Sequence, residues 1–179
     1  MTDHRPDPGS TVALAKSELD GLLLDLQNRG YQTLGPTVKG QHLTYGPIRD
    51  MDDLPYGFST EASPGRFELT YTDNHRYFDA VPGGESWKKY LFPPKTTLFS
   101  AKRTNGTFDI EPFEEKIQPR AFIGVRPCDL AAIDVQDRVF LRDDFADPIY
   151  RRRRENLFIL AVECHTPCAT GFCHSIGTG

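Results

Sequence analysis

The four cysteines of this 179-residue chain all lie after residue 127. They are Cys128, Cys164, Cys168 and Cys173, and the last three fall within ten residues. Thiolates are soft ligands, and four of them suit either one [4Fe–4S] cluster or one tetrahedral zinc ion. The gathering of every thiol near one end of the chain therefore predicts a metal centre.

The spacing of the cysteines leaves three kinds of site open. The four residues are separated by 35, three and four others. This is neither the tight Cys-x2-Cys-x2-Cys run of bacterial ferredoxins nor the paired Cys-x2-Cys knuckles of many structural zinc sites. A zinc site would accept His165 or His174 in place of a thiol. We expect a cluster first, with zinc, or unligated or redox-active thiols, as the alternatives.

Two short apolar runs, residues 121–125 and 157–162, are typical of buried strands. Between them we expect a helix over about 128–141 and a second one after Asp147 and Pro148, an N-cap followed by proline at the first helical position. Strand, helical crossover and strand form a βαβ unit, whose two strands are parallel and end on the same edge of the sheet.

This topology predicts that the cysteines meet. Cys128 follows the first strand by three residues and Cys164 follows the second by two, so both reach one edge. Cys168 and Cys173 lie in the loop just beyond. The carboxyl ends of parallel strands are where α/β sheets place their ligands.

The rest of the chain predicts an α/β or α+β fold, with one domain over residues 11–179 after a disordered lead-in over 1–10. Ser10 or Thr11 is expected to cap an N-terminal helix that ends at Gly30. A mixed sheet rich in hairpins should follow. Its expected strands cover residues 31–34, 42–45, 67–72 and 77–81, with a turn at 73–75, and then 96–104 and 107–110 on either side of Asn105 and Gly106.

Other residues that could do chemistry have simpler interpretations. Trp87, in a short helix before two prolines, is expected to be a packing anchor rather than a stacking surface for a cofactor. His42 and His75 have no ligand-type neighbours in sequence and are taken as ordinary strand or turn residues. The arginines at 151–154 are interpreted as the solvated face of a helix, with docking of an acidic partner as the alternative.

Composition narrows the class of protein. The net charge of −4 argues against nucleic-acid binding, and no apolar run approaches the roughly 20 residues that a spanning helix needs. The first residues lack the apolar segment of a secretory signal, so a cytoplasmic location is expected. Thiols stay reduced there, which favours metal binding over disulfides.

Several motifs together resemble one family. They are Gly-Pro-Ile-Arg at 46–49, Ser-Trp-Lys at 86–88, Gly-Val-Arg-Pro-Cys-Asp-Leu at 124–130, Asp-Pro at 147–148 and Phe-Cys-x-Ser-x-Gly-Thr-Gly at 172–179. The order and combination resemble the iron–sulfur (beta) subunit of cytoplasmic nickel–iron hydrogenases and sulfhydrogenases. Relatives of that family include the A subunit of anaerobic sulfite reductase, and members are often labelled 4Fe–4S dicluster domain-containing proteins.

The resemblance implies an electron-transfer subunit rather than an enzyme by itself. Such a subunit passes electrons between a flavin- and NAD(P)-binding reductase subunit and a nickel–iron hydrogenase or sulfite reductase catalytic subunit. Carried over to this chain, it implies cluster ligands at Cys128, Cys164 and Cys173. The family pattern has a cysteine where this chain has Gly171, so we expect Cys168 to take that ligand's place.

Two further expectations accompany the resemblance. Arg126 and His165, which adjoin the ligands, are expected to contact the cofactor. The resemblance covers about residue 43 to the end, and the ferredoxin-like C-terminal half of the family lies outside this sequence. The alternative function is a non-catalytic subunit-assembly module whose cysteines hold a structural zinc or remain free.

Overall fold

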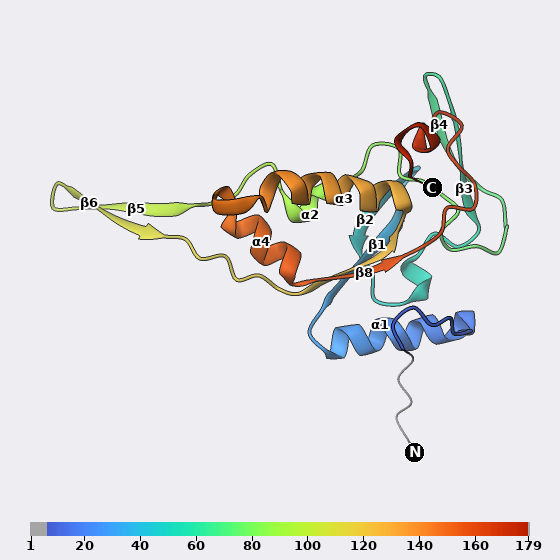
Figure 1. Ribbon diagram of the computed structural model, residues 1–179, viewed down its shortest axis with the longest axis horizontal. Helices are drawn as coiled ribbons and strands as arrows, with labels where there is room; N and C mark the ends of the chain where they lie inside the picture. The colour runs from blue at the N-terminus through green and yellow to red at the C-terminus, as the bar shows by residue number, and fades with distance from the viewer. Residues whose placement is uncertain (1–6, 179) are drawn as a thin grey trace, which may run out of the picture.

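A computed structural model describes residues 7–178 as a mixed α+β fold around one four-stranded sheet (Figure 1). The strand order is β2-β1-β7-β8. β1 (Gln32–Lys39) pairs antiparallel with β2 (His42–Pro47), whereas β1, β7 (Arg120–Val125) and β8 (Leu157–Ala161) run parallel. The expected α/β or α+β class is confirmed.

The N-terminal helix is shorter than the sequence suggested. α1 covers Leu19–Asn28 after a short 3-10 turn, η1 (Lys16–Glu18), so Ser10 and Thr11 do not cap it. The Glu18 carboxylate accepts the backbone N–H of Ala15 at 3.0 Å and organises the entry instead. Gly30 ends the helix as expected, with φ of +87°. Of the expected lead-in, residues 1–6 lie outside the described residues and 7–10 form a turn.

One expected hairpin was wrong. Residues 77–81 form no strand, so the turn at 73–75 joins no hairpin. β4 (Arg66–Tyr71) pairs instead with β3 (Phe58–Ser63), which sequence reasoning missed. The two-residue link between them is Pro64 and Gly65, and Gly65 has the positive φ that such a turn requires.

The βαβ unit is confirmed. β7 leads into α3 (Pro127–Phe140), a short turn η3 (Asp143–Phe145) and α4 (Pro148–Glu155) before the chain returns as β8, parallel to and beside β7. The Asp147 carboxylate accepts the N–H groups of Ile149 and Tyr150 at 2.8 Å each, which is the expected cap.

A glycine bulge ends β7. Gly124 has φ of +84°, and the register with β8 shifts between Ile123 and Val125. A Cβ at this position would lie 2.6 Å from the ring of Phe78, so only glycine fits both the backbone and the space. Because of the bulge, Val125 joins Phe122 on one face of the sheet.

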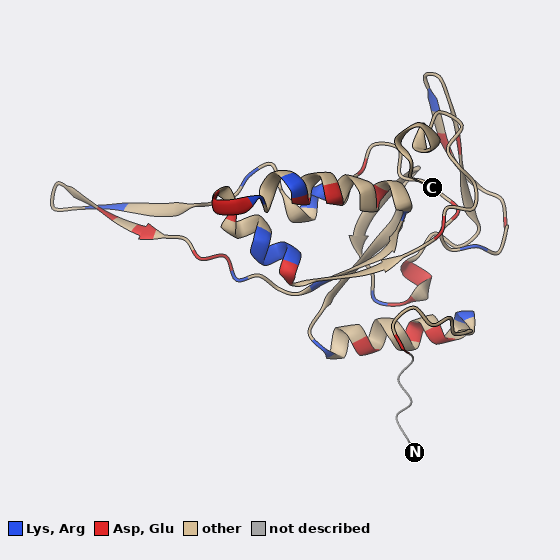
Figure 2. Ribbon diagram, in the orientation of Figure 1, with Lys and Arg blue, Asp and Glu red and all other residues tan. Residues whose placement is uncertain are grey.

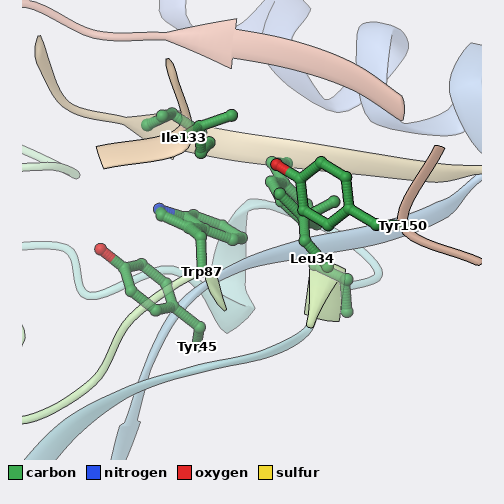
Figure 3. Packing of buried hydrophobic residues seen from close by; sticks show 8 residues of the cluster. Leu34, Tyr45, Trp87, Ile133 and Tyr150 are labelled. Carbon is green, nitrogen blue, oxygen red and sulfur yellow. The ribbon is translucent and has the colours of Figure 1, made fainter. Parts of the chain in front are cut away.

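Two apolar clusters fill the space on either side of the sheet. α1 covers the first with Leu23 and Leu26 against Ala121 and Ile123. The second is centred on Trp87, at the start of α2 (Lys88–Leu91), with ring centroids 3.9 Å from Tyr45 and 4.4 Å from Phe122 (Figure 3). Trp87 is therefore the expected packing anchor.

The arginine run divides between burial and solvent. Arg151 and Arg152 are exposed, but Arg153 is buried and bonds the carbonyl of Leu91 and, at 2.6 Å, the carboxylate of Glu115. Arg154 pairs with Asp137 of α3 at 3.0 Å. The prediction of a fully solvated helix face was wrong for Arg153 and Arg154, because their guanidinium groups bind α4 to the segments packed beside it.

The hairpin around Asn105 and Gly106 is confirmed, with β5 (Phe99–Thr104) antiparallel to β6 (Thr107–Pro112). It projects away from the rest of the molecule, opposite the C-terminal segment (Figure 1). None of the helices in residues 7–178 combines the length and the apolar character needed to cross a bilayer.

Candidate metal centre

The ends of β7 and β8 deliver the first two thiols to one edge of the sheet. The N–H of Val162 donates to the carbonyl of Val125 at 2.9 Å, so the two segments leave the sheet side by side. Cys128 then lies in the first turn of α3, and Cys164 lies three residues beyond the end of β8. The parallel pairing of β7 and β8 therefore directs the segments that carry Cys128 and Cys164 to the same edge of the sheet, as expected.

Asp129 fixes the start of α3 beside Cys128. Its carboxylate accepts the backbone N–H of Arg126 at 3.4 Å and the hydroxyl of Tyr45 at 3.3 Å. Burial raises the pKa of the Asp129 carboxyl, and burial likewise raises the pKa of the Tyr45 hydroxyl. Sequence reasoning did not identify this pair, although an acidic residue three positions after the N-cap can accept the N-cap N–H, which is one half of a capping box.

Arg126 is buried, with 5% of its surface exposed. Its side chain contacts both the segment that carries Cys164 and the loop of residues 78–80. One nitrogen, Nη1, lies 3.3 Å from the Sγ of Cys164. The other, Nη2, donates to three successive backbone carbonyls, those of Phe78, Asp79 and Ala80, at 2.7–3.2 Å. The segment expected as a strand over 77–81 is thus held by a guanidinium, which nothing in its own sequence signals.

Cys168 and Cys173 are brought together by a turn at Gly171. The N–H of Gly171 donates to the carbonyl of Cys168 at 2.8 Å. A Cβ at position 171 would lie 3.5 Å from the Cβ of Cys168 and 3.7 Å from the Sγ of Cys173. A side chain at 171 and the side chain of Cys168 would therefore occupy neighbouring space, next to Cys173.

The thiols differ in their proton affinity. The Thr170 hydroxyl, 3.4 Å from the Sγ of Cys168, lowers the pKa of that thiol, with help from backbone N–H groups. Burial raises the pKa of Cys128, and the charge of Cys173 adds to the effect. All four thiols are free and partly buried.

Cys128 and Cys164 follow neighbouring parallel strands, but in residues 7–178 no three cysteine, histidine or acidic side chains stand close enough to enclose a metal ion. His165 is exposed and lines a pocket of about 290 Å³ with Phe78, Asp79 and Val162. The chain offers the donor type and number that a cluster needs, and the buried cation Arg126 lies against one of the sulfurs.

With this geometry described, comparison with known proteins relates the chain to a hydrogenase subunit. It is 30% identical over 134 residues to sulfhydrogenase 2 subunit beta of Pyrococcus furiosus. The match covers 75% of this chain and 35% of the relative, so the chain spans about a third of the protein that it matches. No family model matches the chain, and no solved structure does.

Proposed function

We propose that this chain is an electron-transfer subunit, or part of one, in an oxidoreductase complex of the hydrogenase or sulfite reductase type. Cys128, Cys164, Cys168 and Cys173 would hold one [4Fe–4S] cluster, which supplies a reversible one-electron couple when bound. The observation that carries the proposal is that β7 and β8, which are parallel neighbours, lead into two free thiols, Cys128 and Cys164, with the free thiols of Cys168 and Cys173 in the segment that follows.

Arg126 supports a bound anionic group at this edge. A buried guanidinium needs compensation, and its hydrogen-bond partners are three neutral carbonyls and the Sγ of Cys164, so a cluster held by that sulfur would supply negative charge beside it. A cation and an N–H donor at a ligand sulfur stabilise the more reduced, more negative state. Arg126 would therefore raise the reduction potential, while His165 would remain at the rim.

Cys168 is the proposed fourth ligand. The resemblance implies a cysteine at the position of Gly171, and the turn at Gly171 puts Cys168 against the space that such a side chain would fill. The lowered pKa of the Cys168 thiol favours the thiolate, which is the form that binds iron.

The complex would supply the other redox centres. A flavin- and NAD(P)-binding reductase subunit and a nickel–iron hydrogenase or sulfite reductase catalytic subunit are the proposed partners, in the cytoplasm. The rival function, an assembly module with zinc or free thiols, would require no reversible redox change.

Redox titration under anaerobic conditions tests electron transfer by this chain. The purified protein is reduced with dithionite and reoxidised while its visible absorption and electron paramagnetic resonance are followed. We expect bleaching and a paramagnetic signal that both reverse on reoxidation. A protein with no reversible change, after anaerobic reconstitution with iron and sulfide, would be a scaffold and not an electron carrier.

A further inference from the structure

The hairpin formed by β5 and β6 has one apolar face that no other segment of residues 7–178 covers. In the register of the two strands, Phe99 faces Pro112, Ala101 faces Ile110 and Arg103 faces Phe108, so these six side chains share one face. The intervening pairs carry the polar residues. Phe99, Phe108 and Ile110 are 57–66% exposed, and every residue of both strands is classed as exposed.

A hairpin of this kind is incomplete by itself. Two strands without a covered face are marginally stable in water. Exposed phenylalanines that lie together on one face are also uncommon on a monomer's surface unless another molecule covers them. The hairpin projects from the body instead of folding back onto it (Figure 1). The apolar face of the hairpin is therefore a candidate binding surface for another protein.

The hydrogen-bond pattern distinguishes the two edges. The N–H of Phe113 donates to the carbonyl of Leu98 at 3.0 Å, which makes this a hydrogen-bonded pair. Pairs alternate along an antiparallel ladder, so residues 99, 101 and 103 of β5 and 108, 110 and 112 of β6 direct their backbone groups outward. The β5 edge offers three N–H groups, but Pro112 leaves the β6 edge with two.

The edges also differ in charge. β5 carries Lys102 and Arg103 and no acidic residue, whereas β6 carries Asp109 and Glu111 and no basic one (Figure 2). Arg103 lies on the apolar face and takes part in no ion pair among residues 7–178. A charged edge restricts pairing to a strand of opposite charge.

These features argue against a second copy of the chain as the occupant. Pairing of β5 with β5 collects four positive charges and no negative one at the seam, and pairing of β6 with β6 collects four negative charges and two prolines. Pairing of β5 with β6 of another copy leaves a free edge on each molecule, so the contact does not close.

We propose that β5 accepts an extended, acidic strand from a different subunit of the complex, with the body of that subunit covering the face of Phe99, Phe108 and Ile110. This rests on the proposed function only in taking the chain to be one subunit of several. The backbone of β5 supplies the hydrogen bonds, and Lys102 and Arg103 select the acidic strand.

A matched pair of proline variants tests the edge. Ala101→Pro and Ile110→Pro lie opposite each other, and each removes one outward N–H without breaking a bond between β5 and β6. The complex is isolated anaerobically through a tag on this chain, and its dissociation and amide hydrogen exchange are measured. Ala101→Pro should weaken the complex by about two- to tenfold, the worth of one hydrogen bond, and Ile110→Pro should weaken it less.

Hydrogen exchange at single-amide resolution gives the second readout. In the complex, the amides of Phe99, Ala101 and Arg103 should exchange about a hundredfold or more slowly than in the free chain, and those of Phe108 and Ile110 should change less. Equal protection of both edges, protection of β6 alone, or slow exchange in a self-associated free chain would overturn the proposal. A chain that purifies alone while its visible spectrum shows a cluster would also overturn it, and electron transfer would still stand.

Discussion

At the scale of single residues, Arg126 connects more of the site than any thiol does. Its guanidinium bonds three consecutive carbonyls of the 78–80 loop and the sulfur of Cys164. Removal would leave the buried carbonyl of Ala80 and the half-buried carbonyls of Phe78 and Asp79 without this donor, and the loss of a buried partner costs more than the bond itself contributes. The position of the 78–80 loop and the position of Cys164 at the edge of the sheet therefore both depend on the Arg126 side chain.

Arg126→Met should lower the free energy of unfolding by about 3–5 kcal/mol, because buried acceptors lose their partners. Urea denaturation of the cluster-free protein measures this without the cofactor. Arg152→Met is the matched control, since Arg152 is exposed on α4, and should change stability by about 0.5 kcal/mol or less. Equal small effects of both variants would contradict the assigned role of Arg126.

The assignment of Cys168 as a cluster ligand can be tested by moving its thiol, because position 171 lies beside the Cys168 side chain. Cys168→Ala should abolish cluster assembly, and the double variant Cys168→Ala with Gly171→Cys should restore part of it, since a side chain at 171 would occupy space next to that of Cys168 and close to the Sγ of Cys173. Iron content after anaerobic reconstitution is the measurement. Full iron content in Cys168→Ala would show that another group is the fourth ligand.

The sequence predicted these residues unevenly. The type and number of the cysteines could be read from the sequence, whereas the contact of Arg126 with Cys164, 38 positions away, was not predicted. The carbonyls that hold Arg126 could not be predicted, because every residue has one and only the tertiary fold selects them. Tyr45 was missed for a related reason: it lies 84 positions from Asp129, and no local pattern joins them.

At the scale of elements, the bulge at Gly124 directs the chain from β7 into α3. Its positive φ and the contact with Phe78 allow no Cβ. Gly124→Ala should therefore cost about 2–4 kcal/mol of stability, from backbone strain and displacement of the Phe78 ring. Thermal and urea unfolding measure the change.

Gly84→Ala is the control for that substitution. Gly84 has no atom within 4 Å of a Cβ and does not have a positive φ, so the change should be near neutral or slightly stabilising. If Gly124→Ala changed stability as little as Gly84→Ala, the glycine bulge would not be required to direct the chain from β7 into α3, where Cys128 lies.

Elements with strong local signals were predicted well. The βαβ unit has apolar strands and a helix with proline at its first position, and Asn105–Gly106 favours the positive φ values of a two-residue hairpin turn. Both predictions were confirmed. The pairing of β3 with β4 was missed because β3 is a polar strand without clear alternation. The start of α1 was wrong because several residues before Leu19 are compatible with a cap, and only packing against the sheet selects one.

At the scale of the whole molecule, the thiol edge and the β5–β6 hairpin lie toward opposite ends of the long axis (Figure 1). Docking through the hairpin would therefore leave the thiols free to face another redox centre. We expect Phe108→Ser, on the hairpin, to weaken assembly of the complex while iron content and visible spectrum stay unchanged. Loss of iron in that variant would contradict this separation of roles.

The central claim is that the four thiols hold one [4Fe–4S] cluster. The most direct test is chemical analysis of iron and acid-labile sulfide, with the visible spectrum, on protein purified without oxygen. The account predicts a brown protein with about four irons and four sulfides per chain, lost when Cys164 is replaced by serine. A colourless protein with one zinc, or with no metal after reconstitution, would contradict it.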